Sequence, residues 1–477
     1  MKKENNQSRA VRPVHLLVRL AIIILIAVIS VVYSDRKAFF ITDQKEPHHE
    51  MRWESIYRLT PKTPIDIVVL GNSHVNTGVE PFSLSCALNC TAFDMAPSGI
   101  MIADAYYCLK ELLTRTTPKL VVVETYLMRG IDNNKLRGAA LADEFRSFYP
   151  RRNLKIKLES LPFLFDAESC LPAWSFTLRN HELLLRNRDL MKYNRDLYEK
   201  RHKSKDNSLY LGRYSRFKTG INDSIMNLYE TKGPAVDGSK EKISRRDIRY
   251  ARKIVDLCNE KGIEVMFFTL PMYELHIGNY DDWMDEQAKA IAPTEKNWYN
   301  MQRPYASGLK RDCFEPTYDK NQHLTIQGSI VATYKLAHYI SDHFKDILPD
   351  RSTDSKWVDL FYGKDGYFEN HTPREDDPDR RLIAKDIILE NEHIIDFFQD
   401  NRGWLFLKLD SDTSRPDDIY VLAELLDGDE KVIGILDMSV SRGLDPVNNK
   451  LYVARLRDNV QILNLVGFYE MPVTRSR

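Results

Sequence analysis

The chain has 477 residues, of which 43% are hydrophobic and 29% are charged. It is about three times longer than a usual domain, and its composition excludes a collagen-like, low-complexity or largely disordered protein. Basic and acidic residues both number 68, so the overall charge does not indicate nucleic acid as a partner. We therefore expect two or three folded units with appendages.

The N-terminus has the pattern of a membrane anchor. Four basic residues lie between positions 2 and 12, and an apolar run follows over residues 14–33 with Arg19 as its single charge. About 20 apolar residues cross a bilayer, and positive charge before a span favours a cytoplasmic N-terminus. We predict a tail and single-pass anchor over residues 1–35 and a juxtamembrane segment over 36–62. The body would then lie in the periplasm or at the cell surface. A cleaved signal peptide is the alternative, but its apolar region is usually shorter.

Residues 63–348 have the pattern of an α/β domain. Short apolar runs typical of buried strands alternate with helical patterns such as those at 102–113 and 247–260. The runs lie at residues 65–70, 120–125 and 263–270. This alternation predicts a parallel sheet with functional loops at the carboxyl ends of its strands.

Two further regions stand out by charge. Residues 132–242 are too long for an ordinary connection and predict a helical insertion; within them, residues 151–220 contain 16 basic and 8 acidic residues. Residues 352–477 are acidic and contain short strands separated by turn sequences, which predicts a β-rich, sandwich-like domain. The basic insertion favours an anionic polymer or lipid headgroups as partners.

No metal site or cofactor is indicated. The six cysteines form no CxxC pair, no HxH, HExxH or clustered-aspartate motif supports a metal site, and the chain has no glycine-rich phosphate loop. We expect most of the thiols to be buried.

Ser73 and His323 are the candidate catalytic residues. Ser73 lies in Gly71-Asn72-Ser73-His74 directly after a strand, where a turn into a helix exposes a hydroxyl. His323 lies at a loop-to-helix boundary, and Asp319 precedes it by four residues, so the carboxylate could hold the imidazole in one tautomer. Taken singly, the serine could be a helix cap and the histidine a core residue. Their combination favours an acyl-transfer site.

The two motifs together resemble the SGNH (GDSL-like) hydrolase superfamily, in which a serine after the first strand works with an aspartate and a histidine on one late loop. Residues 70–74, with Gly78 and Pro81, are similar to a membrane-anchored branch that includes D-alanyl-teichoic-acid transfer proteins. Residues 92–99 are similar to the second block of the family. The resemblance implies a flavodoxin-like three-layer fold, an oxyanion hole made by the amides of Ser73 and Gly99, and a membrane-bound acyltransferase as a possible partner class.

The chain departs from the family pattern at two places. The late motif of the family is Asp-x-x-His, whereas Lys320 occupies that aspartate position and Asp319 is one residue further away. We expect Asp319 to orient His323, with Asn321 as the alternative. The third-block asparagine of the family is also missing, and Glu124 stands after the corresponding strand, as a capped strand-end carboxylate or a substrate contact.

These residues predict a bacterial, outward-facing serine esterase or O-acyltransferase that acts on acyl esters of an envelope polysaccharide or polymer. Ser73 would attack the acyl carbonyl, His323 would take and return the proton, and Asp319 would orient His323. The alternative is an inactive scaffold or glycan-binding component of an envelope polysaccharide complex. The displaced aspartate and missing asparagine favour that alternative.

Overall fold

A computed structural model gives the structure of the chain. It describes chiefly residues 7–36, 46–128, 139–180, 220–240, 243–279, 290–302, 311–319 and 321–362, together with the backbone of seven strands between residues 381 and 470.

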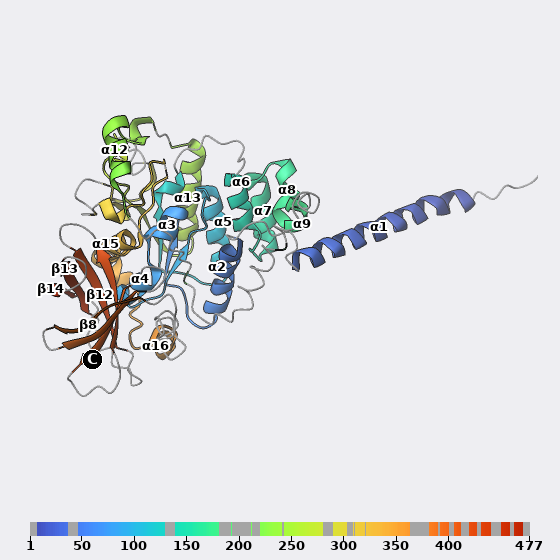
Figure 1. Cartoon of the computed structure of the whole chain (residues 1–477). Helices are drawn as coiled ribbons and strands as arrows, with labels where there is room; N and C mark the ends of the chain where they lie inside the picture. The colour runs from blue at the N-terminus through green and yellow to red at the C-terminus, as the bar shows by residue number, and fades with distance from the viewer. Residues whose placement is uncertain are drawn as a thin grey trace, which may run out of the picture.

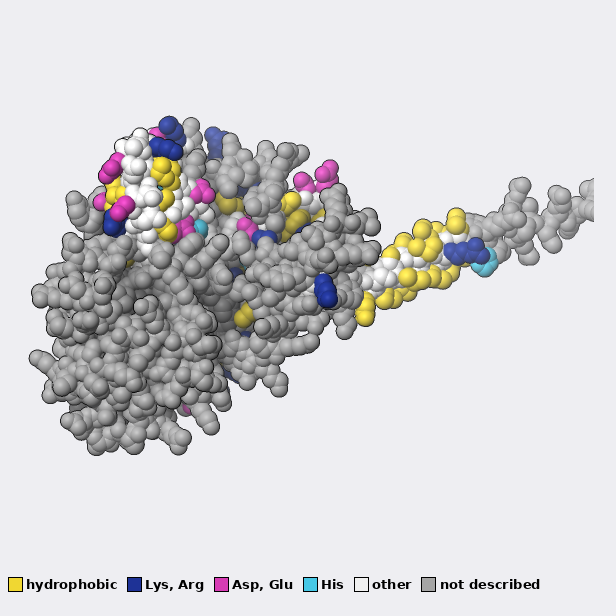
Figure 2. Space-filling view, in the orientation of Figure 1, with side chains coloured by type: hydrophobic (Ala, Val, Ile, Leu, Met, Phe, Trp, Pro, Cys, Tyr) yellow, Lys and Arg dark blue, Asp and Glu magenta, His cyan; other side chains and the backbone are white. Residues whose placement is uncertain are grey.

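Helix α1 (Gln7–Arg36) projects away from the body, as Figure 1 shows. Its segment Val14–Asp35 is long and apolar enough to cross a membrane, and none of it is buried in the protein. Figure 2 shows hydrophobic side chains along its length and basic ones toward its outer end. The N-terminal prediction of one membrane-length apolar helix is confirmed.

Five parallel strands form the central sheet, in the order β2-β1-β3-β5-β7. They are β1 (Ile67–Leu70), β2 (Ala92–Met95), β3 (Leu120–Glu124), β5 (Glu264–Thr269) and β7 (Trp298–Asn300). Every residue of β1, β2 and β3 is buried, which explains why these strands are apolar except at Asp94 and Glu124. Counted within this sheet the order is 2-1-3-4-5, that of a doubly wound fold, whose ligands bind where the order reverses beside the first strand. The predicted α/β class is confirmed.

Helices cover both faces of the sheet. Helix α5 packs against α13, while α3 and α4 pack against α15, as right-handed crossovers require. The bounds are α3 (Ser73–Gly78), α4 (Pro81–Leu88), α5 (Ile102–Leu112), α13 (Arg245–Asn259) and α15 (Ile326–Phe344). The juxtamembrane segment contains α2 (Glu46–Leu59), whose Trp53 and Ile56 are buried in the same core. At the other end, Trp357 of α16 (Ser355–Tyr362) also belongs to that core.

The insertion consists of short helices in its described parts. They are α6 (Ala139–Phe148), α7 (Leu154–Leu164), α8 (Ala167–Trp174), α9 (Phe176–Asn180) and α12 (Asp223–Lys232), and most of residues 181–219 lie outside the described residues. Two of its basic residues are buried. Arg151 contacts Asp104 of α5 and donates to Ser147 Oγ at 3.1 Å. Burial lowers the pKa of Lys157 to about 8. The number of lysines and arginines in the insertion therefore overstates its positive charge at the surface.

Several short elements complete the described chain. A two-stranded parallel sheet pairs β4 (Val236–Asp237) with β6 (Ile277–Gly278). The 3-10 helices are η1 (Thr125–Met128), η2 (Gly238–Lys240), η3 (Glu295–Asn297), η4 (Arg311–Cys313) and η5 (Lys345–Ile347). Of these, η1 and η4 lie next to the candidate site described below.

The C-terminal region contains seven strands that pair antiparallel in chain order, from β8 to β14. They are β8 (Arg381–Leu389), β9 (Glu392–Gln399), β10 (Leu405–Ser411), β11 (Ile419–Leu426), β12 (Lys431–Ser439), β13 (Lys450–Arg457) and β14 (Ile462–Glu470). The strands form a single meander, whereas the sequence predicted two packed sheets. Hairpin turns between successive strands are enough to produce this order.

Candidate active site

Ser73 lies at the carboxyl edge of the sheet, three residues after the end of β1, where it begins α3. Asn72 caps this helix, and its side chain accepts a hydrogen bond from the His74 amide at 3.1 Å. The turn is tight: a Cβ atom on Gly71 would lie 2.1 Å from Val75, so only glycine fits. The first amides of a helix have no acceptor within the helix, so the Ser73 N–H is available to a ligand. Ser73 itself is half-buried.

His323 contacts both the serine and a carboxylate. Its Nε2 lies 2.9 Å from Ser73 Oγ, and its Nδ1 lies 3.0 Å from Glu315 Oε1. With the proton on Nδ1, the imidazole donates to Glu315 and accepts from the serine hydroxyl. This is the arrangement in which a histidine can take a proton from a serine while a carboxylate fixes its tautomer. The structure thus brings Ser73 and His323 together, as the sequence predicted.

Glu315 reaches His323 because the chain forms a narrow antiparallel hairpin there. Phe314 and Leu324 form a β-bridge, and the amide of Glu315 donates to the His323 carbonyl at 2.9 Å. Residues opposite each other in an antiparallel pair project to the same side, so the two side chains meet. The hairpin is held by α15, because a Cβ atom on Gly328 would lie 2.2 Å from the Cys313 carbonyl oxygen.

Asp319 was the wrong choice of orienting carboxylate. It lies near the tip of this hairpin, it is exposed, and its amide donates to Thr317 Oγ1 at 3.1 Å. The alternative, Asn321, is engaged elsewhere: its Oδ1 lies 3.2 Å from His74 Nε2. A separation of four residues would suit a helix, but a hairpin places residues close by their register instead. An acidic residue eight positions before the histidine carries no recognisable motif, so the sequence reading missed Glu315.

Gly99, the second predicted oxyanion donor, lies in the loop after β2, next to α3. Two side-chain amides of the Ser73 turn hold this loop: Asn72 Nδ2 donates to the Ile100 carbonyl at 3.5 Å, and Asn76 Nδ2 donates to Ser98 Oγ at 3.1 Å. Gly99 has φ +77°, and a Cβ atom there would lie 2.0 Å from Asp143 Oδ2. Backbone and packing both require glycine at this position, and its amide remains a proposed donor.

Arg52 of α2 is linked through Asn76 to the loop that contains Gly99. This buried arginine donates through Nη2 to Asn76 Oδ1 at 3.0 Å and through Nε to the Asp94 carbonyl at 3.2 Å. Because Asn76 in turn donates to Ser98, the juxtamembrane helix is linked to the loop that contains Gly99.

We predict that Arg52→Met lowers the free energy of unfolding by about 2–4 kcal/mol, since hydrogen bonds to a charged group contribute about 1.5–3 kcal/mol each. Chemical denaturation of the full chain measures this loss. Arg58→Met is the matched control, because Arg58 belongs to the same helix but is exposed. Its side chain donates one long hydrogen bond, to Ser55 Oγ at 3.4 Å. Equal stability of the two variants would contradict a role for Arg52.

Glu124 is the last residue of β3, the strand after which the pattern that this chain resembles has an asparagine. Its two oxygens accept hydrogen bonds from the amides of Tyr126, at 2.9 Å, and Leu270, at 3.4 Å. Burial raises the pKa of Glu124 well above its ordinary value, which favours the neutral form. The ring of Tyr126 stacks on His74, with 3.6 Å between centroids. Glu124 is thus a strand-end cap, one of the two roles the sequence allowed.

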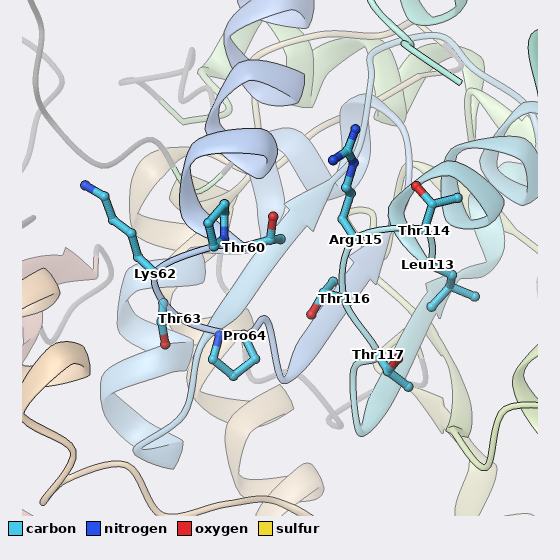
Figure 3. A pocket seen from close by; sticks show the side chains of 10 residues that line it. Thr60, Lys62, Thr63, Pro64, Leu113, Thr114, Arg115, Thr116 and Thr117 are labelled. Atoms are coloured by element: carbon cyan, nitrogen blue, oxygen red, sulfur yellow. The ribbon is translucent and has the colours of Figure 1, made fainter. Parts of the chain in front are cut away.

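A hollow of about 460 Å³ lies near the amino ends of β1 and β3, on the edge of the sheet away from Ser73. Half of the residues that line it are threonines, and the side chains of Lys62 and Arg115 point away from its middle in Figure 3. The hollow is therefore separate from the candidate site.

Among the described residues, no three His, Cys, Asp or Glu side chains are grouped so as to bind a metal ion. The Ser73, His323 and Glu315 side chains come from two segments that are 240 residues apart or more, and only the fold brings them together. No protein-family model matches the chain, and no curated protein matches its sequence.

Proposed function

We propose that the protein is a serine esterase or O-acyltransferase of the SGNH type, anchored in the membrane by α1 and acting on acyl esters of a cell-envelope polysaccharide or polymer. The observation that carries this proposal is the continuous chain of contacts from Ser73 Oγ through His323 to Glu315. These contacts lie where the strand order of the doubly wound sheet reverses, which is where ligands bind in such folds. Position and chemistry therefore support the same role for the three side chains.

The reaction follows from the roles of these atoms. As Ser73 Oγ bonds to the acyl carbonyl carbon, its proton passes to His323 Nε2, and the carbonyl oxygen becomes an oxyanion. The amides of Ser73 and Gly99 would stabilise that oxyanion. When the intermediate collapses, the alcohol leaves with the proton from His323, and an acyl-serine remains. Water or a second hydroxyl group then takes the acyl group by the same steps in reverse order.

The place of action and the substrate class follow from the anchor and the charge pattern. The basic residues before the apolar segment Val14–Asp35 favour a cytoplasmic N-terminus and therefore an extracytoplasmic Ser73. The basic excess of the insertion favours substrates that carry phosphate or carboxylate groups.

A pair of fluorophosphonate probes tests both the chemistry and the orientation. Intact bacteria that express the full chain are treated with a membrane-impermeant probe or with a permeant one, and the adduct is located by peptide mass spectrometry. We expect both probes to modify Ser73, and neither to modify the Ser73→Ala or His323→Ala variant. Labelling by the permeant probe alone would overturn the orientation but leave the chemistry intact. A folded protein that neither probe modifies would favour the inactive scaffold.

A further inference from the structure

The insertion exposes a group of large apolar side chains close to the point where the membrane helix joins the body. Outside α1, six large hydrophobic residues of the described chain are exposed, and five of them lie within residues 154–178. Leu171 is 69% exposed, Leu154 59% and Leu158 54%. Exposing a leucine rather than burying it costs about 1.5–3 kcal/mol, so such a concentration indicates a surface that is normally covered.

The exposed leucines lie on three short helices that pack in sequence, α7 against α8 and α8 against α9. Leu154 and Leu158 are four residues apart on α7, and neighbours at that spacing lie on the same side of a helix. Leu171 lies on α8 and Leu178 on α9, and these two short helices pack against each other. We call these four residues the α7–α9 apolar face.

A direct contact fixes one end of this face at the end of α1. Asp35 Oδ1 accepts hydrogen bonds from the amide and from the hydroxyl of Thr177, both at 2.8 Å. Thr177 belongs to α9, and the next residue is Leu178. Figure 1 likewise shows α1 meeting the body beside α9, with α12 at the far side of the body.

The length of the anchor sets the depth of this contact. The apolar segment Val14–Asp35 has 22 residues, which as a helix extend for about 33 Å. The hydrocarbon core of a bilayer is about 30 Å thick, so Asp35 lies at its outer boundary. Tyr33, which is 57% exposed, sits just inside that boundary, where aromatic side chains are enriched.

We propose that the α7–α9 apolar face lies in the outer interface of the same membrane that α1 spans. Helices of this kind bury their apolar side about 5–10 Å into the boundary between headgroups and acyl chains. The exposed Arg152 and Lys155 beside the face suit anionic headgroups, while the nearby Glu159 is paired with Lys110 at 2.6 Å. The proposal requires α1 to span the membrane, and it is independent of the chemistry of Ser73. The α7–α9 contact would hold the body at a fixed height and tilt, rather than on a free tether.

Depth-dependent quenching in proteoliposomes tests the proposal. The full chain is reconstituted in phosphatidylcholine and phosphatidylglycerol, with spin-labelled lipids as quenchers. Each variant carries one fluorescent amino acid, at position 158, 171 or 178, or at position 24 or 230 as a reference. We expect strong quenching at these positions by a shallow label, strong quenching at Ile24 by a deep label, and almost none at Glu230 of α12, which is exposed.

A variant with charged residues on the α7–α9 apolar face tests whether this face is what contacts the membrane. Leu158→Glu with Leu171→Glu should reduce quenching at position 178 several-fold, whereas Leu275→Glu, at an exposed leucine outside the insertion, should not change it. If Ile24 is quenched and positions 158, 171 and 178 are not, another protein or another part of this chain covers the face, and the proposal is wrong. If Ile24 is not quenched either, α1 does not span the membrane.

Discussion

Ser73→Ala and His323→Ala should each reduce the cleavage of an acyl ester, such as p-nitrophenyl acetate, by about 10⁴-fold or more. The serine hydroxyl is a weak nucleophile until a base removes its proton, and the 2.9 Å contact shows His323 in place for that transfer. Because the two side chains act as one unit, the double variant should be little slower than either single variant. Steady-state kinetics of the purified full chain would measure these losses.

Two substitutions away from the site serve as controls for this result. Ser239→Ala changes an exposed serine of η2, and His343→Ala changes a histidine in the last turn of α15. Neither should alter the rate by more than the error of the assay. Retention of full activity by a correctly folded Ser73→Ala variant would leave the serine mechanism without support, and the scaffold function would then be preferred.

Glu315→Gln should reduce the rate by about 10²–10⁴-fold, because the amide can also present its NH₂ group to Nδ1 and so stabilise the wrong tautomer of His323. The loss should appear mainly in kcat, since Glu315 contacts His323 and not the substrate. The backbone hydrogen bond between Glu315 and His323 is retained in this variant, so the hairpin should keep its stability.

Asp319→Asn is the matched comparison, because it makes the same chemical change four residues away on the same hairpin. It should leave the rate and the melting temperature unchanged. The opposite pattern, with a silent Glu315→Gln and a damaging Asp319→Asn, would mean that the loop rearranges in solution and that the sequence-based choice of Asp319 was correct.

The sequence alone was sufficient wherever the signal is local. An apolar stretch of membrane length, a buried β-branched strand and a serine in the turn that follows it are each encoded by adjacent residues. For this reason α1, the α/β class and the position of Ser73 could be predicted. His323 was found in the same way, from its place just before the helix that Thr325 caps.

The tertiary structure decided which residues meet. Glu315 joins the site because Phe314 pairs with Leu324, and this register cannot be read from spacing. Arg52 is linked to the loop of Gly99 through Asn76, and it comes from a helix that the sequence assigned to a juxtamembrane segment. The role of Glu124 as a cap, rather than a substrate contact, depended on the amide of Tyr126 in η1 and on that of Leu270, just after β5. Arg52 and Asn76 are 24 residues apart, and Glu124 and Leu270 are 146 apart. Glu315 and His323 are only eight residues apart, but they meet through the register of their hairpin. Such contacts are set by packing and register, about which local sequence carries no information.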